Sequence, residues 1–518
     1  MKSFLPLIFL LGLLAACQPT SETHAPWTDA TQHLFEDGLK PFYHGVASGD
    51  PLQDAVILWT RVTPIDSLPE IEVRWEVSTS EEFELIAAQG TTTTDPGRDY
   101  TVKVDAQGLE PGTAYFYRFH ALDATSMTGR TRTAPTASEQ LKFAVVSCSN
   151  YEFGYFNAYG ALAARTDLDA ILHLGDYIYE YGQGVYGDTT IGRLNLPAKE
   201  LVALSDYRTR YSQYRLDPDL RAAHANHPFI NIWDDHEIAN DAYQDGAQNH
   251  QEDEGPFETR RSAAVQTYYE WIPIREGKHY RTFGYGDLAE VIMLDERLAG
   301  RTAPADSLTD PRLQAEDRSM LGAEQLAWLQ NQLTESNAQW KVIGNQVIFS
   351  YLNWGFEPNF TINLDSWDGY PQEQKALADF IREQEIKDLV FVTGDTHTSW
   401  AFEASVSPFE NYNAATSEGA IAIEFGTTSI NSGNTNDREG ATDSLVMVHE
   451  QRISNSPINP HLKFVNMRDH GYLLLQLEKE KARAEWHYVG DMSVRNPATT
   501  LGKAFEVQAG TVKLLEQE

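Results

Sequence analysis

The chain has 518 residues, of which 42% are hydrophobic, 11% aromatic and 22% charged. This composition excludes a fibrous, a disordered and a multi-span membrane protein, and the length favours two domains over one. The formal net charge of -35 disfavours binding to nucleic acid and to anionic membranes, because like charges repel. An anionic substrate would need a locally positive site, of the kind that bound metal ions provide.

The N-terminus has the pattern of an export signal. Lys2 precedes an apolar run over residues 4–14, which is too short to span a bilayer and is typical of the core of a signal peptide. The run leads into LAAC at residues 14–17, which resembles the lipobox of bacterial lipoproteins, where cleavage before the cysteine leaves an acylated N-terminus. A plain secretory signal with a chance cysteine is the alternative.

We therefore expect residues 1–16 to be a lipoprotein signal peptide and Cys17 to carry the lipid, since acyl chains anchor a protein without spanning the membrane. Gln18 follows the cysteine, in place of the aspartate that is linked to inner-membrane retention in enteric bacteria. The predicted location is the periplasm, with the anchor in the outer membrane. Residues 17–41 are polar and form a predicted tether between the lipid and the folded body.

Residues 42–136 are predicted to form a small all-β sandwich. Short apolar runs recur at residues 55–61, 72–78, 100–104 and 114–121, with turn residues between them. No helical pattern interrupts these runs, which is typical of a β-sandwich. The sequence GLEPGTAY within this region resembles the end of a fibronectin type III-like domain.

The pattern changes after this region, and residues 140–518 are predicted to form a second, α/β domain. Buried-strand runs alternate with helical stretches, such as residues 322–336 and 372–385. The runs are residues 142–147 (KFAVVS), 170–174 (AILHL), 229–233 (FINIW), 290–294 (EVIML), 340–344 (WKVIG) and 389–393 (LVFVT). Polar groups follow these runs, at the carboxyl ends of strands, where such sheets place their ligand sites.

Four of these strand ends carry side chains that ligate metals. They deliver, in chain order, Cys148, then Asp176 and Tyr179, then Asp234, Asp235 and His236, and finally Asp395 and His397. A single aspartate at a strand end is more often a helix cap or a turn former. Several carboxylates on one rim, however, repel one another unless a cation or a shared proton separates them. A metal site is the simpler explanation of the whole set.

The ligand types indicate which metals to expect. Thiolate, phenolate and carboxylate suit a hard, highly charged ion such as Fe³⁺, and a second cluster of oxygen ligands suits Ca²⁺, Mg²⁺ or Mn²⁺. Two ions that share a carboxylate would generate hydroxide at neutral pH and bind a phosphoryl group for in-line attack. Cys148 has no disulfide partner once Cys17 is lipidated; it is an inert buried thiol or a ligand, and its place at a strand end favours the ligand.

Together these segments resemble the PhoD-like alkaline phosphatases of the calcineurin-like metallophosphoesterase superfamily. The resemblance covers nearly the whole chain after Phe42. It rests on HGVASGD (44–50), WTR (59–61), SCS (147–149), GDYIYEY (175–181), YRTRYSQYRLDPD (207–219), WDDHEIAN (233–240), WDGYP (367–371) and GDTHTSW (394–400). It implies an α/β (α+β) metallophosphoesterase core, a mixed β-sandwich flanked by helices, preceded by the small all-β fibronectin type III-like domain.

The resemblance also implies the cofactors, Fe³⁺ and Ca²⁺, and the roles of their ligands. Cys148 stands where most of the superfamily has its first metal-binding aspartate. Asp176 would bridge the two metals, and Tyr179 would bind Fe³⁺. Asp395 and His397 would supply one ligand each to the two ions.

The resemblance also bears on four further site residues, with a definite role for two of them and an open choice between the other two. Asp235 occupies the place of an asparagine that contacts the second metal, and His236 would lie beside the phosphate and stabilise or protonate the leaving oxygen. Asn345 and Gln346 fall where the superfamily has a further histidine ligand, and the choice between them stays open. Arg208 is a candidate substrate contact for a different reason: it lies in a helical-looking stretch rich in tyrosine and arginine. Surface ion pairs are the expected role of at least two of the three arginines in that stretch.

Further residues have both a functional and a structural interpretation. Trp367 and Tyr370 line a substrate pocket or pack in the core. Asp295 and Arg297 are expected to form a structural ion pair, and His173 is expected to pack on its buried strand.

The predicted function is an exported, metal-dependent alkaline phosphatase that hydrolyses small organic phosphate esters by a two-metal hydroxide mechanism. A phosphodiesterase or phospholipase D-like activity at the same site is the alternative, and a non-catalytic surface lipoprotein is the third hypothesis. We expect a monomer that contacts the membrane only through its lipid anchor and does not bind nucleic acid. The N-terminus has Lys2 but no arginine pair, so we expect export of the unfolded chain and metal loading outside the cytoplasm.

Overall fold

The computed structural model of the chain describes residues 26–355, 361–438 and 440–517. The predicted signal peptide, Cys17 and the first part of the predicted tether lie outside the described residues.

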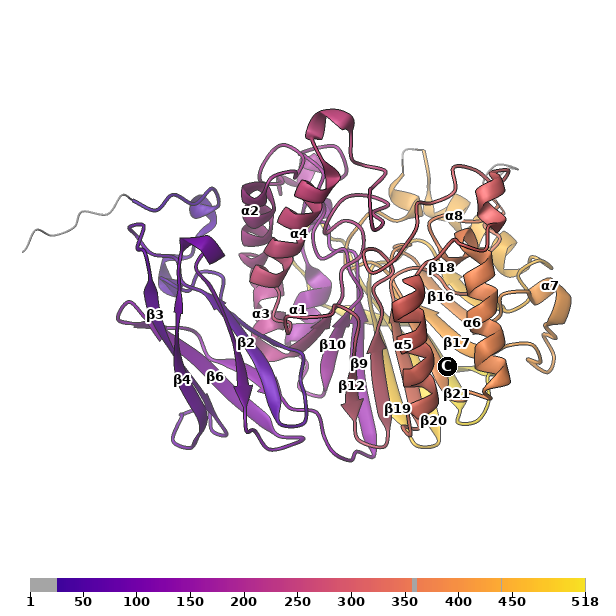
Figure 1. The fold of residues 1–518 in the computed structure, drawn as a ribbon, viewed down its shortest axis with the longest axis horizontal. Coiled ribbons are helices and arrows are strands. Elements are labelled where there is room, and N and C mark those ends of the chain that lie inside the picture. The colour runs from indigo at the N-terminus through magenta and orange to yellow at the C-terminus, as the bar shows by residue number, and fades with distance from the viewer. Residues whose placement is uncertain (1–25, 356–360, 439, 518) are drawn as a thin grey trace, which may run out of the picture.

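The first described strands form a β-sandwich (Figure 1). One layer contains β1 (Val46–Gly49), β2 (Ala55–Arg61) and β5 (Thr101–Gln107), and the other contains β3 (Ile71–Ser78), β4 (Ile86–Thr94), β6 (Ala114–Ala121), β7 (Ala124–Thr125) and β8 (Gly129–Arg132). Side chains of β6 alternate between buried and more exposed positions, as expected for a strand with one face on a core. Leu58, Val73, Tyr117 and Phe119 are among the residues that fill this core.

The layer that holds β1 continues into a ten-stranded sheet. Its other strands are β9 (Gln140–Val146), β10 (Ala170–His173), β11 (Pro228–Asn231), β19 (Gly471–Glu478), β20 (Lys481–Val489), β21 (Thr499–Gln508) and β22 (Leu514–Gln517). The junction is a parallel pairing of β1 with β11, with Ser48 opposite Pro228. Strands from residues 42–136 and from residues 140–518 therefore share one sheet, and the division into two domains stays a prediction.

A second sheet of seven strands packs on the ten-stranded sheet. It contains β12 (Arg281–Tyr285), β13 (Ala289–Met293), β14 (Trp340–Asn345), β15 (Leu389–Thr393), β16 (Ser399–Ala404), β17 (Ala422–Gly426) and β18 (Leu462–Asn466). Strands β13, β14, β15 and β17 are parallel neighbours. Apolar side chains from both sheets, such as Val145, Leu172, Val291 and Val392, form the core between the two layers.

Helices cover the outer faces of both sheets (Figure 1). Those packed on the ten-stranded sheet are α1 (Asn157–Ala163), α2 (Leu204–Arg215), α3 (Pro218–Asn226) and α4 (Phe257–Trp271). Those packed on the seven-stranded sheet are α5 (Gly322–Glu335) and α6 (Pro371–Glu383), and two more are α7 (Pro408–Asn411) and α8 (Asp443–Ser454). In α6, Leu377 and Ile381 lie one turn apart and are both buried, so a single apolar stripe attaches the helix.

The predicted fold class, a helix-flanked mixed β-sandwich after an all-β segment, is confirmed. Each of the six predicted strand runs overlaps a strand, from β9 to β15, and the predicted helices at 322–336 and 372–385 are α5 and α6 with small shifts at their ends. Within the described residues, no helix is both long and apolar enough to cross a bilayer.

The carboxyl ends of the parallel strands from both sheets meet. The loop after β9 contacts the loop after β10 through Cys148 N–H, which donates to the Gly175 carbonyl at 3.1 Å, and the loop after β17 through Ser432 N–H, which donates to the Cys148 carbonyl at 3.2 Å. Gly394, after β15, donates to the Gln346 carbonyl after β14 at 3.0 Å. The loops that carry the predicted strand-end residues therefore contact one another where the two sheets meet.

Candidate metal centre

Four predicted ligands have an unusual backbone conformation. Cys148, Asp176, Asp395 and His397 have φ angles of 60°, 56°, 63° and 63°. This left-handed region is uncommon for residues other than glycine and costs free energy, so it persists where surrounding contacts enforce it, often at functional sites. Each of these residues lies in the short turn after a strand, and the reversal of the backbone turns the chain sharply at the sheet edge.

The first group of ligand-type side chains contains Cys148, Asp176 and His397, whose donor atoms lie within 4.8 Å of one another. The Tyr179 hydroxyl joins them, at 3.0 Å from Asp176 Oδ2 and 3.0 Å from His397 Nε2. Ser432, after β17, donates to the Tyr179 oxygen at 2.7 Å. A thiol, a carboxylate, a phenol and an imidazole are thus brought together at one place.

Aspartates form further groups next to the first one. Asp234, Asp235 and Asp395 have carboxylate oxygens within 4.8 Å of one another, and Asp176 makes a similar group with Asp235 and His236. Asp235 also approaches Asp241 and Asp365. Asp176 and Asp235 therefore connect the thiol-containing group to a carboxylate-rich region.

The charges of this arrangement favour a bound cation. Burial, reinforced by neighbouring acidic groups, raises the pKa of the Cys148 thiol and of the Asp176 and Asp395 carboxyls well above their ordinary values. Among the described residues, Asp176 Oδ1, Asp234 Oδ2 and Asp235 Oδ1 are buried without a hydrogen-bond partner. Buried ionised ligands without partners are costly unless a metal compensates them, so these residues fit a metal centre.

Arg297 is a central residue of the site that the sequence interpretation placed elsewhere. We expected an ion pair with Asp295, but that carboxylate accepts the backbone N–H of Arg297 at 3.0 Å. The fully buried guanidinium instead pairs with Asp234 and with Asp365 at 2.7 Å, and lies 3.8 Å from Asp235. Burial alone would raise the pKa of Asp235, but Arg297 and His236 hold it below its ordinary value.

His236 is held by a carboxylate that sequence reasoning did not single out. Its Nδ1 lies 2.7 Å from Glu180 Oε2, and both residues are buried. The other Glu180 oxygen accepts from Asn240 N–H and Asn249 Nδ2, each at 2.8 Å. Burial opposes protonation of His236, yet Asp235, Glu180 and Asp176 together raise its pKa well above the ordinary value. Glu180 directly follows the predicted ligand Tyr179, which is the only sequence signal for its role.

Glu237 ties two of the strand ends together. Its carboxylate accepts backbone N–H groups from Asp176 at 3.0 Å, Tyr177 at 2.7 Å and Asp234 at 2.9 Å. Burial raises the pKa of Glu237 to about 8. This carboxyl therefore orients the loops that carry Asp176 and Asp235.

Three candidate contacts have other partners. Asn345 Oδ1 accepts from Trp367 Nε1 at 3.3 Å, and Gln346 Nε2 donates to the Leu294 carbonyl at 2.6 Å, so both amides are engaged with protein groups. Arg208 forms an ion pair with Glu270 at 2.6 Å and lines a different cavity, near the first sandwich. The structure thus places Arg208 away from the ligand groups, because its guanidinium is committed to Glu270.

The aromatic and histidine candidates with two interpretations are packed. Trp367 is fully buried and donates to Glu296 Oε1 at 2.6 Å. The Tyr370 hydroxyl donates to the Thr302 carbonyl at 2.7 Å, and His173 Nε2 lies 2.8 Å from the Tyr159 hydroxyl. Trp367, Tyr370 and His173 therefore make the packing contacts that their structural interpretation predicts.

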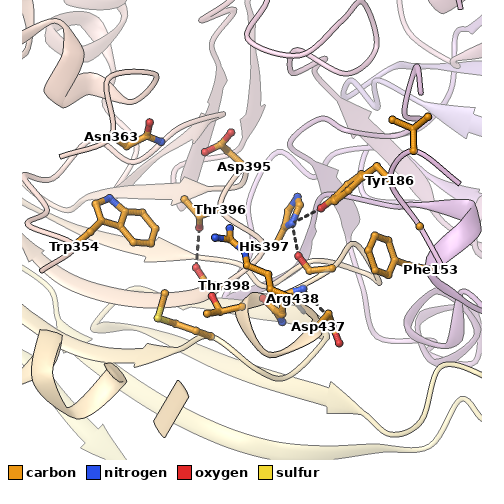
Figure 2. A pocket seen from close by; sticks show the side chains of 16 residues that line it. Phe153, Tyr186, Trp354, Asn363, Asp395, Thr396, His397, Thr398, Asp437 and Arg438 are labelled. Carbon is orange, nitrogen blue, oxygen red and sulfur yellow. Dashed lines mark hydrogen bonds between the residues drawn. The ribbon is translucent and has the colours of Figure 1, made fainter. Parts of the chain in front are cut away.

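A cavity of about 1000 Å³ opens beside the first ligand group (Figure 2). Asp395 and His397 belong to its wall, so the ligand groups are accessible from it. The other lining residues are Phe153, Val185, Tyr186, Gly187, Trp354, Asn363, Thr396, Thr398, Gly433, Asn434, Thr435, Asp437, Arg438 and Met467. Several come from the loop after β17, which the sequence interpretation did not include although an apolar run, AIEFG, precedes it as at the other strand ends.

A family model, a relative in sequence and a solved structure match this chain to the same family. Residues 143–486 match the model of a family described as PhoD-like phosphatase, and residues 29–135 match the N-terminal domain of PhoD-like phosphatase. Alkaline phosphatase D of Bacillus subtilis (strain 168) is 38% identical over 452 residues, which are 82% of this chain and 74% of the relative. A solved structure described as the structure of PhoD has a TM-score of 0.81 and 33% identity, and the match covers 93% of each chain.

Proposed function

This chain belongs to the PhoD-like phosphatase family and is a phosphoric ester hydrolase, and from that premise we propose that it is an exported, metal-dependent alkaline phosphatase. The observation that carries the proposal is the connected set of ligand groups. Cys148, Tyr179 and His397 lie close to Asp176, and Asp176 forms a second group with Asp235 and His236. This is the arrangement that two neighbouring cations with a shared carboxylate require.

We propose Fe³⁺ for the first group and Ca²⁺ for the second. Thiolate, phenolate, carboxylate and imidazole at Cys148, Tyr179, Asp176 and His397 suit a ferric ion. The aspartates around Asp235 offer only oxygen ligands, which suit Ca²⁺. When bound, such a pair of cations supplies an activated water and neutralises charge on the phosphoryl oxygens.

The protein's own residues would orient the reaction. Glu180 holds Nδ1 of a protonated His236, which leaves the opposite ring edge to donate to the leaving oxygen of the ester. Arg297 keeps Asp234 and Asp365 in place beside Asp235. Glu237 holds the backbone of the Asp176 turn. These supports fix the geometry before a substrate binds.

The cellular setting is proposed from the sequence. The apolar run, the LAAC segment and Cys17 support export to the periplasm and a lipid anchor in the outer membrane. The net charge of -35 argues against nucleic acid as a partner and supports small organic phosphate esters, whose charge the centre itself would neutralise. We propose a monomer.

Hydrolysis of phosphodiesters is the second candidate. A cavity of about 1000 Å³ is at the upper end of the volumes that hold drug-sized ligands, so it has room for the organic groups on both sides of a diester. Rates on 4-nitrophenyl phosphate and on bis(4-nitrophenyl) phosphate, measured on the same preparation, separate the two activities.

Metal removal tests the proposal. The purified protein should hydrolyse at least one of these esters at alkaline pH, and chelation or Asp176→Asn should lower the rate by more than about 100-fold, because the shared ligand and its charge are lost. Asp105→Asn, on an aspartate paired with Arg275 at the surface, is the control and should keep the rate. Full activity after exhaustive metal removal would contradict the proposal.

The identity of the first ion has a spectroscopic test. A ferric ion bound by Tyr179 and Cys148 should colour the protein, and Tyr179→Phe should remove or shift the visible absorption band while elemental analysis still finds iron. A colourless protein with full activity and no iron would rule out this assignment and leave the phosphatase proposal standing.

A further inference from the structure

Arg438 contributes a cationic side chain to the wall of the cavity beside His397. In the view of Figure 2 its side chain extends toward the middle of the cavity, near Thr396 and His397. The residue directly follows the short 3₁₀ helix Thr435–Asp437, at the end of the loop after β17. Among the described residues, no other arginine and no lysine belongs to this wall.

The loop holds the Arg438 backbone in a defined place. Its N–H donates to the Thr435 carbonyl at 3.4 Å, and its carbonyl accepts from Ala441 at 3.0 Å. The same loop touches the ligand groups through Ser432, which donates to Tyr179, and through the Gly433 carbonyl, which lies 2.9 Å from His397 Nδ1. Arg438 is therefore anchored to the centre by its main chain.

The guanidinium of Arg438, in contrast, has no partner among the residues that the structure describes. Over residues 26–355, 361–438 and 440–517 it makes no hydrogen bond and no ion pair. The adjacent carboxylate of Asp437 is committed elsewhere, since it accepts from Asn434 N–H at 2.7 Å and lies 3.2 Å from His470 Nε2. Asp395 lies 3.6 Å from Arg297. The carboxylates of the cavity wall thus leave Arg438 un-neutralised.

A free cation at this position is notable in so acidic a protein. The net charge of -35 repels anions from the surface as a whole, whereas a cation in a partly enclosed cavity attracts them locally. A guanidinium binds carboxylate and phosphate through charge-assisted, often bidentate hydrogen bonds.

The remaining wall is suited to an apolar unit. Phe153 and Tyr186 lie on one side of the cavity and Trp354 on the other (Figure 2). The Trp354 ring packs on Trp400, with ring centroids 5.3 Å apart, which fixes its orientation. Aromatic faces bind flat or apolar groups, so a ligand that fits this wall combines such a group with an anion for Arg438.

We propose that Arg438 binds a second anionic group of the substrate, so that the preferred esters carry a leaving group in which an apolar unit bears a carboxylate or a phosphate. This inference rests on the proposed phosphatase function and names the substrate class for that site. Arg438 would act in specificity, because it lies on the cavity wall and not among the ligand groups.

The test uses matched substrates that differ in one charge. 4-Carboxyphenyl phosphate is compared with its neutral isostere, 4-carbamoylphenyl phosphate, and 4-(phosphonomethyl)phenyl phosphate tells whether a phosphate-type anion is preferred over a carboxylate. The same leaving groups are also tested as methyl diesters, so the comparison holds whichever ester class the enzyme prefers. The quantity measured is the ratio of kcat/KM for the anionic substrate to that for the neutral one.

The test variants are R438Q and R438K. Both new side chains are similar in length, but glutamine is neutral whereas lysine keeps the positive charge. R438Q should lower the ratio by about 10- to 100-fold, as expected for the loss of a charge-assisted hydrogen bond, and R438K should retain most of it. R74A removes an exposed arginine of β3 and should leave the ratio unchanged, which controls for net charge. High salt should reduce the wild-type ratio.

Two outcomes overturn the inference. If R438Q lowers kcat/KM equally for both members of a pair, Arg438 serves the transferred phosphoryl group or the local structure. If R438Q changes neither, the guanidinium is not used. A wild-type protein that hydrolyses none of these esters would instead reject the phosphatase proposal, so the two failures are distinguishable.

Discussion

At the scale of single residues, the groups that support the ligands are as informative as the ligands themselves. Glu180 lies against His236 and engages three hydrogen-bonding groups in a buried position. A carboxylate in this role selects one tautomer of the imidazole and stabilises its protonated form. Arg297 has the complementary role, as a buried cation among aspartates.

Replacing Glu180 tests this support. Glu180→Gln removes one negative charge beside His236, so the pKa of His236 should fall, and the activity should fall by about 10- to 100-fold. Since we propose that the protonated imidazole donates to the leaving oxygen, the alkaline limb of the plot of rate against pH should move to lower pH. Glu200→Gln, which alters a carboxylate paired with Arg260, should leave the profile in place; an identical profile in both variants would contradict the assigned role.

At the scale of elements, the centre is built from tight turns after buried parallel strands. The strands alone cannot aim the ligands, since consecutive side chains of a strand point to opposite faces. The left-handed residues Cys148, Asp176, Asp395 and His397 reverse the chain at the strand ends. Gly175 makes a close approach between two such turns, because a Cβ there would lie 2.3 Å from the Asp234 backbone nitrogen.

Gly175→Ala should therefore damage the centre. Gly175 has a φ of 107° and faces backbone atoms that cannot move aside, so the methyl group should cost roughly 2–4 kcal/mol of unfolding free energy and separate Asp176 from Asp235. The measurements are thermal unfolding and metal content. Gly192→Ala is the matched control, because Gly192 also has a positive φ of 79° but open space around it, and it should cost only about 1 kcal/mol. Equal effects of the two substitutions would disprove the steric argument.

At the scale of the whole molecule, the centre forms only where the two sheets meet. Its candidate ligands come from the loops after β9, β10 and β11 of one sheet and after β15 of the other, and Arg297 follows β13. The first sandwich is continuous with this body through β1 and through Asp50, which pairs with Arg281 of β12 at 2.8 Å. Removal of the ions should therefore lower the unfolding free energy of the whole protein, since ions that bind only the folded state stabilise it.

The dependence of that stability on pH has a definite sign. In the metal-free protein, burial raises the pKa of Asp234 to about 6, of Asp241 to about 7 and of Glu237 to about 8. The unfolded chain ionises these groups near their ordinary values, around pH 4. As the pH rises from about 4 to about 8, the folded form must ionise buried carboxyls, so its stability falls. Bound cations remove this penalty.

The Tm difference between metal-loaded and chelated protein should therefore widen from about pH 5 to about pH 8. At the upper end of this range we expect a difference of about 10 °C, the scale of a tightly bound stabilising ligand. Differential scanning calorimetry at several pH values measures it. A constant or shrinking difference would contradict the placement of the ions among these carboxyls.

The sequence by itself determined the fold class and the positions at which ligand-type residues follow strands. Both are local properties: a short apolar run predicts a buried strand, and the polar residue after it must lie at a sheet edge. Cys148, Asp176 and His397 could therefore be selected from strand-end position and side-chain chemistry alone, and the fold brings their donor atoms within 4.8 Å of one another. The family resemblance supplied their expected roles.

Only the tertiary structure decided which strand ends face each other and what supports them. Arg297 reaches Asp234 across 63 positions of the chain, and Ser432 reaches Tyr179 across 253, separations over which spacing carries no information. The pairing of β1 with β11 and the position of Arg438 in the cavity wall also bring together segments that are far apart in the sequence. They follow from the packing of two sheets, whose free energy is summed over many side chains and cannot be assigned to any one segment.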